Sequence, residues 1–108
     1  MLRSNLMVKS CVHAEISIIP IGSSTSLSMY IASAIQAIKD SKGIRYHEVT
    51  GMGTLVEAED IDALFRAVKA ARDAIVEQGI KRVEILVRID ERFDKEKSLR
   101  EKVEAVQR

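Results

Sequence analysis

Residues 44–58 read IRYHEVTGMGTLVEA, and this stretch decides the fold. Residues 44–50 and 54–58 are two short segments rich in β-branched and aromatic residues. The only closely spaced glycine pair, Gly51 and Gly53, lies between them. Two such segments around a short glycine-containing connection predict a β-hairpin. The elements on either side of this hairpin therefore determine the topology.

Upstream of the hairpin, the pattern predicts a strand followed by a helix. Residues 12–21, VHAEISIIPI, alternate apolar and polar side chains as a half-buried strand does. Residues 23–26, SSTS, are suited to capping a helix N-terminus. Apolar residues then recur at helical spacing, and Gly43 follows as a stop signal. The apolar stripe of this helix consists of Leu27, Ile31, Ala34, Ile35 and Ile38.

Downstream of the hairpin, the same order repeats. Glu59, Asp60 and Asp62 suit the positive end of a helix dipole. The predicted apolar stripe of this second helix is Ile61, Leu64, Phe65, Val68, Ala71, Ile75 and Val76. Gly79 ends the helix, and residues 83–89 alternate as a fourth strand. In the charged tail, the spacing of Leu99, Val103 and Val106 predicts a short, mostly exposed helix.

The order β-α-β-β-α-β predicts a ferredoxin-like α/β (α+β) fold. Two right-handed crossovers interleave into a four-stranded antiparallel sheet with both helices on one face. We expect a single domain over residues 1–108, with its core at about 12–92. Residues 1–10 read as a loose extension, and residues 93–108 as the charged segment with the C-terminal helix.

Composition argues against several classes of function. The net charge of +1 and the scarcity of aromatic residues predict no nucleic-acid partner. Cys11 is the only cysteine, which rules out an intrachain disulfide, and we expect no metal or cofactor. No apolar run approaches the ~20 residues of a membrane span. Because no signal-peptide pattern is evident either, we expect a cytoplasmic protein.

The uncovered face of the sheet is the candidate functional surface. Side chains out of phase with the core should point there: His13, Glu15, Ser17, Ile19, Glu48, Thr50, Leu55, Glu57, Glu84, Leu86 and Arg88. A simply solvated face is the plain interpretation. However, Ile19, Leu55 and Leu86 together would form an exposed apolar patch, which favours an interface. Subunits packed through this face would leave polar pockets at their seam.

Catalytic motifs are weak. His13 and His47 lack the spacing of a metal site, and a lone strand histidine is more often a packed or surface residue. Cys11 shares a strand face with His13, but its place at the strand start favours an inert thiol. Residues 51–54, GMGT, precede a strand rather than a helix and so are not a phosphate loop.

Three segments in this order resemble the small thiamine-binding protein family: residues 14–22 (AEISIIPIG), 50–60 (TGMGTLVEAED) and 81–92 (KRVEILVRIDER). The resemblance spans about residues 12–92. One departure is Gly51, which stands where the usual T-P-M-G-T run has proline. The resemblance implies a non-catalytic module for thiamine or its hydroxymethylpyrimidine moiety, associated through sheet faces into homodimers or homotetramers.

Carried onto this chain, the resemblance and the polarity of the open face imply a set of ligand-binding residues. They are Glu15, Ser17, Ile19, Glu48, Thr50, Met52, Gly53, Thr54, Glu57 and Arg88. Carboxylates would neutralise the thiazolium or accept from the amino group, and hydroxyls would contact ring nitrogens. We expect the site at the seam between subunits.

Two alternatives stay open. One is an oligomeric sensor of the ACT type, with residues 23–26 holding an amino acid or another anion at the helix start. The other is an enzyme that uses His13 or His47 as a base, for which no orienting partner is evident.

Overall fold

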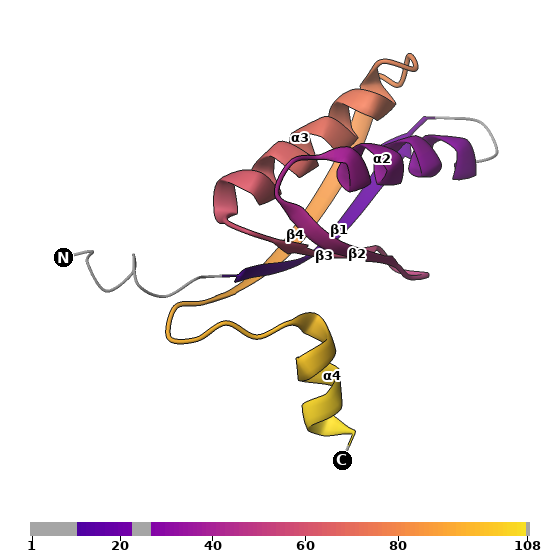
Figure 1. Cartoon of the computed structure of the whole chain (residues 1–108). Coiled ribbons are helices and arrows are strands. Elements are labelled where there is room, and N and C mark those ends of the chain that lie inside the picture. Colours follow the sequence, from indigo (N-terminus) through magenta and orange to yellow (C-terminus); the bar gives the residue numbers. More distant parts are fainter. Residues whose placement is uncertain (1–10, 23–26, 108) are drawn as a thin grey trace.

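The structure, a computed structural model, describes residues 11–22 and 27–107. Its elements are β1 (Cys11–Ile21), α2 (Ser28–Asp40), β2 (Ile44–Val49), β3 (Thr54–Ala58), α3 (Ile61–Val76), β4 (Arg82–Arg92) and α4 (Leu99–Val106). The strands form one sheet in the order β2-β3-β1-β4, and every neighbouring pair is antiparallel. Helices α2 and α3 lie together on one face (Figure 1). This arrangement confirms the predicted β-α-β-β-α-β fold.

The core lies between the sheet and helices α2 and α3. The inward side chains of β1 are buried, as the period of two predicts, and Ala34 and Ile38 of α2 meet them. On α3, however, Phe65 is 53% exposed and Val76 is 41% exposed, so their placement in the core stripe was wrong. Ala63 and Ala67 are buried instead. Small side chains let α3 approach its neighbours closely, which turns the larger Phe65 toward solvent.

The helix ends follow their sequence signals in part. The Asp60 carboxylate accepts a hydrogen bond from the Ala63 backbone N–H (2.7 Å) and so caps α3, as the acidic start predicts. Helix α2 has Leu27 as its N-cap residue, without a side-chain cap. The predicted caps at residues 23–26 lie outside the described residues. Gly43, expected as a stop signal, adopts a positive φ of 92° just after α2.

Helix α4 lies on the side of the sheet opposite to α2 and α3, which we call the open face (Figure 1). A capping box between Ser98 and Glu101 starts the helix, and it has no buried residue. The prediction of a short, mostly exposed helix is therefore confirmed. No helix among residues 11–22 and 27–107 is long and apolar enough to cross a membrane.

Candidate functional site

The sheet is opened at one end of β1. Pairing between β1 and β3 stops at Ile16 opposite Thr54, whereas β1 continues along β4 until Ile21 faces Arg82. Beyond Ile16, β1 therefore has no strand on its β3 side in the part of the chain that the structure describes. Main-chain polar groups on such an edge are available to a ligand or another strand.

A cavity of about 250 Å³ occupies this opening, and we call it the turn notch. It lies between β1, α2 and the connection from β2 to β3. Six of the ten predicted site residues line it: Ser17, Ile19, Thr50, Met52, Gly53 and Thr54. Much of the remaining lining is aliphatic, from Ile16 and Ile18 of β1 and the inner side of α2. The notch thus combines an apolar interior with a strand edge and several hydroxyls.

Thr50 holds the turn that forms one wall of the notch. Its backbone N–H and its hydroxyl both donate to the Gly53 carbonyl, at 2.8 and 2.9 Å. The same hydroxyl accepts from the backbone N–H groups of Met52 and Gly53, both at 3.2 Å. The hydroxyls of Ser17 and Thr54 have no hydrogen-bond partner among the described residues; Ser17 is half-buried, whereas Thr54 is only 5% exposed and lies on the core side with Ile16.

Gly53 lets the turn approach β1 closely. A Cβ at this position would stand 3.0 Å from the Ile16 carbonyl oxygen and 3.3 Å from Glu15 Cγ. A glycine is therefore the residue that fits. The contact also places the Glu15 side chain beside the turn, at the border between the notch and the open face. Glu15 does not line the notch, but its side chain lies at the border of the cavity.

The rim of the notch carries exposed apolar side chains. Met52 at the tip of the turn is 83% exposed, and Val49 is 55% exposed. Val49 lies on the helix side of the sheet, because it pairs with Thr54, but it is not in the core. Ile19 and Leu86 add apolar surface on the open face nearby. Exposed apolar residues gathered around a hollow are typical of a binding site or an interface.

The remaining three predicted site residues lie on the open face, away from the notch. Arg88 faces Glu15 across β1 and β4, yet the two form no ion pair. Glu48 accepts a hydrogen bond from the Tyr46 hydroxyl at 2.8 Å. Glu57 accepts the Leu99 backbone N–H at 2.5 Å and so fixes the start of α4. The structure does not bring all ten residues into one pocket.

His13 is the unexpected group of the open face. It lies opposite Asp90 and Glu57, where the sequence predicts an uncovered side chain, but it is only 5% exposed. The segment from β4 to α4 covers it, and the Lys97 backbone makes a small contribution that favours its charged form. Burial, followed by the nearby Lys102 ammonium, lowers the pKa of His13 below its usual 6.5. Its Nε2 is buried without a hydrogen-bond partner among the described residues.

Other predicted chemistry finds less support. Cys11 is a buried free thiol whose pKa is raised, first by burial and then by Glu57. A thiol in this setting is a poor nucleophile, in line with the inert thiol that we expect. Among residues 11–22 and 27–107, no cluster of three or more His, Cys, Asp or Glu could hold a metal ion. The ACT-type alternative at residues 23–26 lies outside the described residues.

Sequence comparisons relate the chain to the thiamine-binding and UPF0045 proteins. The thiamine-binding protein family matches residues 14–107. A UPF0045 protein of Methanothermobacter thermautotrophicus is 50% identical over 96 residues, which cover 88% of this chain and 95% of the relative. The UPF0045 protein YqgV of Bacillus subtilis is 38% identical over 96 residues, covering 86% of this chain and 91% of YqgV.

Solved structures agree in fold. The protein MJ1052 of Methanocaldococcus jannaschii superposes with a TM-score of 0.79 at 36% identity, over 89% of this chain and 95% of MJ1052. A Thermotoga maritima protein, named for a suggested role in thiamine biosynthesis or salvage, gives a TM-score of 0.73 at 28% identity. That match covers 90% of this chain and 99% of the other. The family is described by binding rather than by a reaction. This chain belongs to the thiamine-binding protein family.

Proposed function

We propose that this protein binds thiamine or its hydroxymethylpyrimidine moiety in the turn notch, without catalysing a reaction. The observation that carries the proposal is the β1 edge left unpaired beside the Thr50–Gly53 turn. An aminopyrimidine presents an N–H donor next to a ring-nitrogen acceptor, which matches the alternating C=O and N–H groups of a strand edge. Membership of the thiamine-binding family supports the same ligand class.

The rest of the notch suits one ring. Its volume of about 250 Å³ is near the lower end of small-molecule pockets, which favours a pyrimidine over a larger cofactor. The half-buried Ser17 hydroxyl, which has no partner among the described residues, would pair with a ring nitrogen, and the Thr54 hydroxyl lies deeper in the notch. The aliphatic side chains of β1 and α2 pack on the ring faces. Glu15, beside the turn, is placed to neutralise a thiazolium that extends onto the open face.

A second copy of the chain completes this proposal. Helix α4 reaches one end of the open face, where Leu99 and Lys102 meet Glu57 and Asp90. The end nearer the notch keeps Ile19 and Leu86 exposed, at 38% and 70%. We therefore place the subunit seam at that end, next to the ligand.

Thermal unfolding with added ligands tests the binding. A ligand specific to the folded state stabilises it by about 2.7 kcal/mol at one hundred times its Kd. We expect thiamine and hydroxymethylpyrimidine to raise the midpoint and an amino-acid panel to leave it unchanged. No shift with either pyrimidine compound would refute the proposed ligand.

Glu15→Gln tests the orientation, with Glu84→Gln as the matched control. Glu84 lies on the same face, opposite Ile19 on β4, which is on the side of β1 away from the Thr50–Gly53 turn. Losing a charge-assisted contact costs about 1.5–3 kcal/mol, so we expect roughly 10- to 100-fold weaker thiamine binding. Binding of hydroxymethylpyrimidine, which lacks the thiazolium, should change less than about threefold. Equal losses for both ligands, or an equal loss in Glu84→Gln, would contradict the placement of Glu15.

A further inference from the structure

A second hollow lies at the other end of β1, beneath the segment that joins β4 to α4. Its volume is about 280 Å³, and four cationic side chains line it: Arg92, Lys95, Lys97 and Lys102. Asp90 and Glu91 are its acidic members, and His13 and Cys11 complete it. We call it the basic hollow. Its lining carries more positive than negative charge, although the whole chain is nearly neutral.

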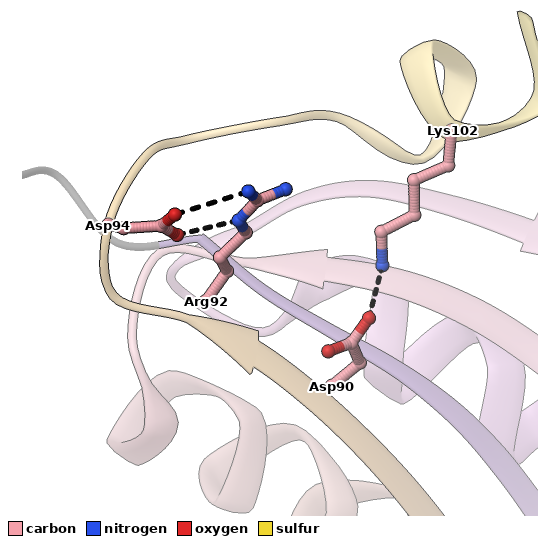
Figure 2. Close-up of polar contacts among 4 residues, drawn as sticks. All are labelled: Asp90, Arg92, Asp94 and Lys102. Carbon is pink, nitrogen blue, oxygen red and sulfur yellow. Dashed lines mark hydrogen bonds and ion pairs between the residues drawn. The ribbon is translucent and has the colours of Figure 1, made fainter. Parts of the chain in front are cut away.

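Two of the four cations are held in place by carboxylates. Lys102 Nζ lies 2.6 Å from Asp90 Oδ2, and Arg92 binds both carboxylate oxygens of Asp94, at 2.6 and 3.1 Å. Figure 2 shows these pairs beneath the segment that arches from β4 to α4. Hydrogen bonds with these cations hold the pKa values of Asp90 and Asp94 below their usual range. The carboxylates are therefore ionised and orient their partners.

The other two cations are uncommitted. Lys95 and Lys97 form no hydrogen bond or ion pair through their side chains within the described ranges, although both border the hollow. Lys95 contributes to the lowered pKa of Asp94 and Lys97 to that of Glu101, but neither lysine is bonded to these carboxylates. An incoming anion would meet these ammonium groups without breaking a contact that holds the fold.

His13 supplies an independent sign that the hollow takes a ligand. The side chain is 95% buried, given its 5% exposure, and its Nε2 has no partner among the residues described. A buried polar atom without a partner is costly, and it calls for a ligand or another explanation. A neutral imidazole that carries its proton on Nδ1 leaves Nε2 as an acceptor. The missing group is therefore a hydrogen-bond donor that tolerates cationic surroundings.

We propose that the basic hollow binds a phosphate group. The negative charge of phosphate would interact with the lysine ammonium groups. Near neutral pH, phosphate also has an ionisable proton that it can donate to Nε2. Phosphate donates this proton to His13 Nε2 in a hydrogen bond or transfers it to the ring. Compared with free phosphate dianion and neutral imidazole, the complex therefore contains one additional proton. Sulfate has the same shape and charge but no proton to donate at this pH. Phosphate is therefore preferred over sulfate.

The charged groups around His13 agree with this proton coupling. Lys102 acts on it from α4, Asp90 from β4 and Glu57 from β3, while the covering segment contributes the Lys97 backbone. Without an anion, burial and Lys102 disfavour the imidazolium. A bound phosphate offsets both effects. Its affinity therefore rises as the pH falls from about 8 toward the usual His13 pKa of 6.5.

The phosphate site is independent of the proposed thiamine site. His13 and Ser17 are four residues apart on one strand, about 13 Å. Phosphate and thiamine should therefore bind together, and variants in one site should spare the other. Failure of either proposal leaves the other standing.

Calorimetric titration of the full chain tests the site, with inorganic phosphate and sulfate as probes. We expect phosphate to bind about tenfold more tightly than sulfate at pH 7, with proton uptake seen as a buffer-dependent heat. Glycerol phosphate as a further probe separates a free phosphate from a phosphomonoester as the preferred source. Equal affinity for phosphate and sulfate, or no binding of phosphate at about 10 mM, would overturn the proposal.

Variants assign the binding to these residues. The double variant Lys95→Gln/Lys97→Gln should weaken phosphate about tenfold. Lys81→Gln/Arg82→Gln removes the same charge at the opposite end of β4 and should have no effect beyond about twofold. His13→Gln should abolish proton uptake and the preference over sulfate. If that variant does not fold, the lysine pair still decides, because equal losses in both double variants would leave only general charge attraction.

Discussion

Gly43→Ala tests the closest packing contact that a glycine makes in this fold. Gly43 has a φ of 92°, which L-residues adopt at a cost of about 1–2 kcal/mol. A Cβ there would stand 2.6 Å from Ala63 Cβ and 3.2 Å from Glu59 Cγ. The backbone is tied down as well, because the Glu59 N–H donates to the Gly43 carbonyl at 2.9 Å. Overpacking of this kind adds about 1–3 kcal/mol, so we expect a loss of roughly 3 kcal/mol.

Two other glycines distinguish the cost of a positive φ from the cost of a steric clash. Gly79 has a similar φ of 95° but open space around its Cβ position, so Gly79→Ala should cost only about 1 kcal/mol. Gly51 does not have a positive φ, and no atom of the described residues lies within 4 Å of a Cβ added there, so Gly51→Ala should be neutral or stabilising by about 0.5 kcal/mol. Urea unfolding with a constant m-value measures all three. Equal losses for Gly43→Ala and Gly79→Ala would refute the close approach between the α2–β2 turn and α3.

Three further predictions concern the turn, the buried histidine and α4. Gly51→Pro should stabilise the fold by about 0.4–1 kcal/mol, because the Gly51 N–H donates to no group among the described residues and the turn position suits proline. An unfolding midpoint below that of the parent would contradict this. Because the pKa of His13 is lowered in the folded state, its contribution to the free energy of unfolding is full above pH 6.5 and is lost as the pH falls below it, where the unfolded chain takes up the proton first. His13→Gln should therefore flatten the fall in the free energy of unfolding with decreasing pH, measured from unfolding curves. An unchanged pH dependence would exclude His13 as its source. Glu57→Ala should remove the acceptor of the Leu99 N–H and so speed amide hydrogen exchange across α4, while the amides of α3 stay protected. Unchanged exchange in α4 would show that other contacts hold the helix.

Much of the fold could be predicted because it depends on local patterns. The alternation in β1 and the glycine pair between β2 and β3 specify strand phase and connection without any long-range information. The error on α3 has a simple cause. Periodicity weights large apolar residues such as Phe65, whereas close helix packing selects the small Ala63 and Ala67. Composition alone does not distinguish an alanine in a tight contact from one on the surface.

The candidate site was predicted less completely. The residues of the TGMGT turn line the same cavity as Ser17 and Ile19 because the pairing of β1 with β3 stops at Ile16 and Thr54. The resemblance to the family identified these residues together. The burial of His13 depends instead on where α4 docks. Heptad-like spacing predicts that residues 99–106 form a helix but not which surface it reaches. That docking rests on single polar contacts from Glu57 and Asp90, which have no sequence signature.

The position of α4 divides the open face into two chemically different ends. At the end beneath α4, ionised carboxylates fix cations around a buried imidazole, and a second copy would have to displace those contacts to dock there. At the other end, apolar side chains surround an unpaired strand edge, and a second copy would bury surface that is otherwise exposed to water. Helix α4 has no buried residue, so polar contacts rather than apolar burial attach it to the first end of the face. In the assembly that we propose, a phosphate bound at that end would strengthen its polar contacts and leave the notch end as the surface for the second copy.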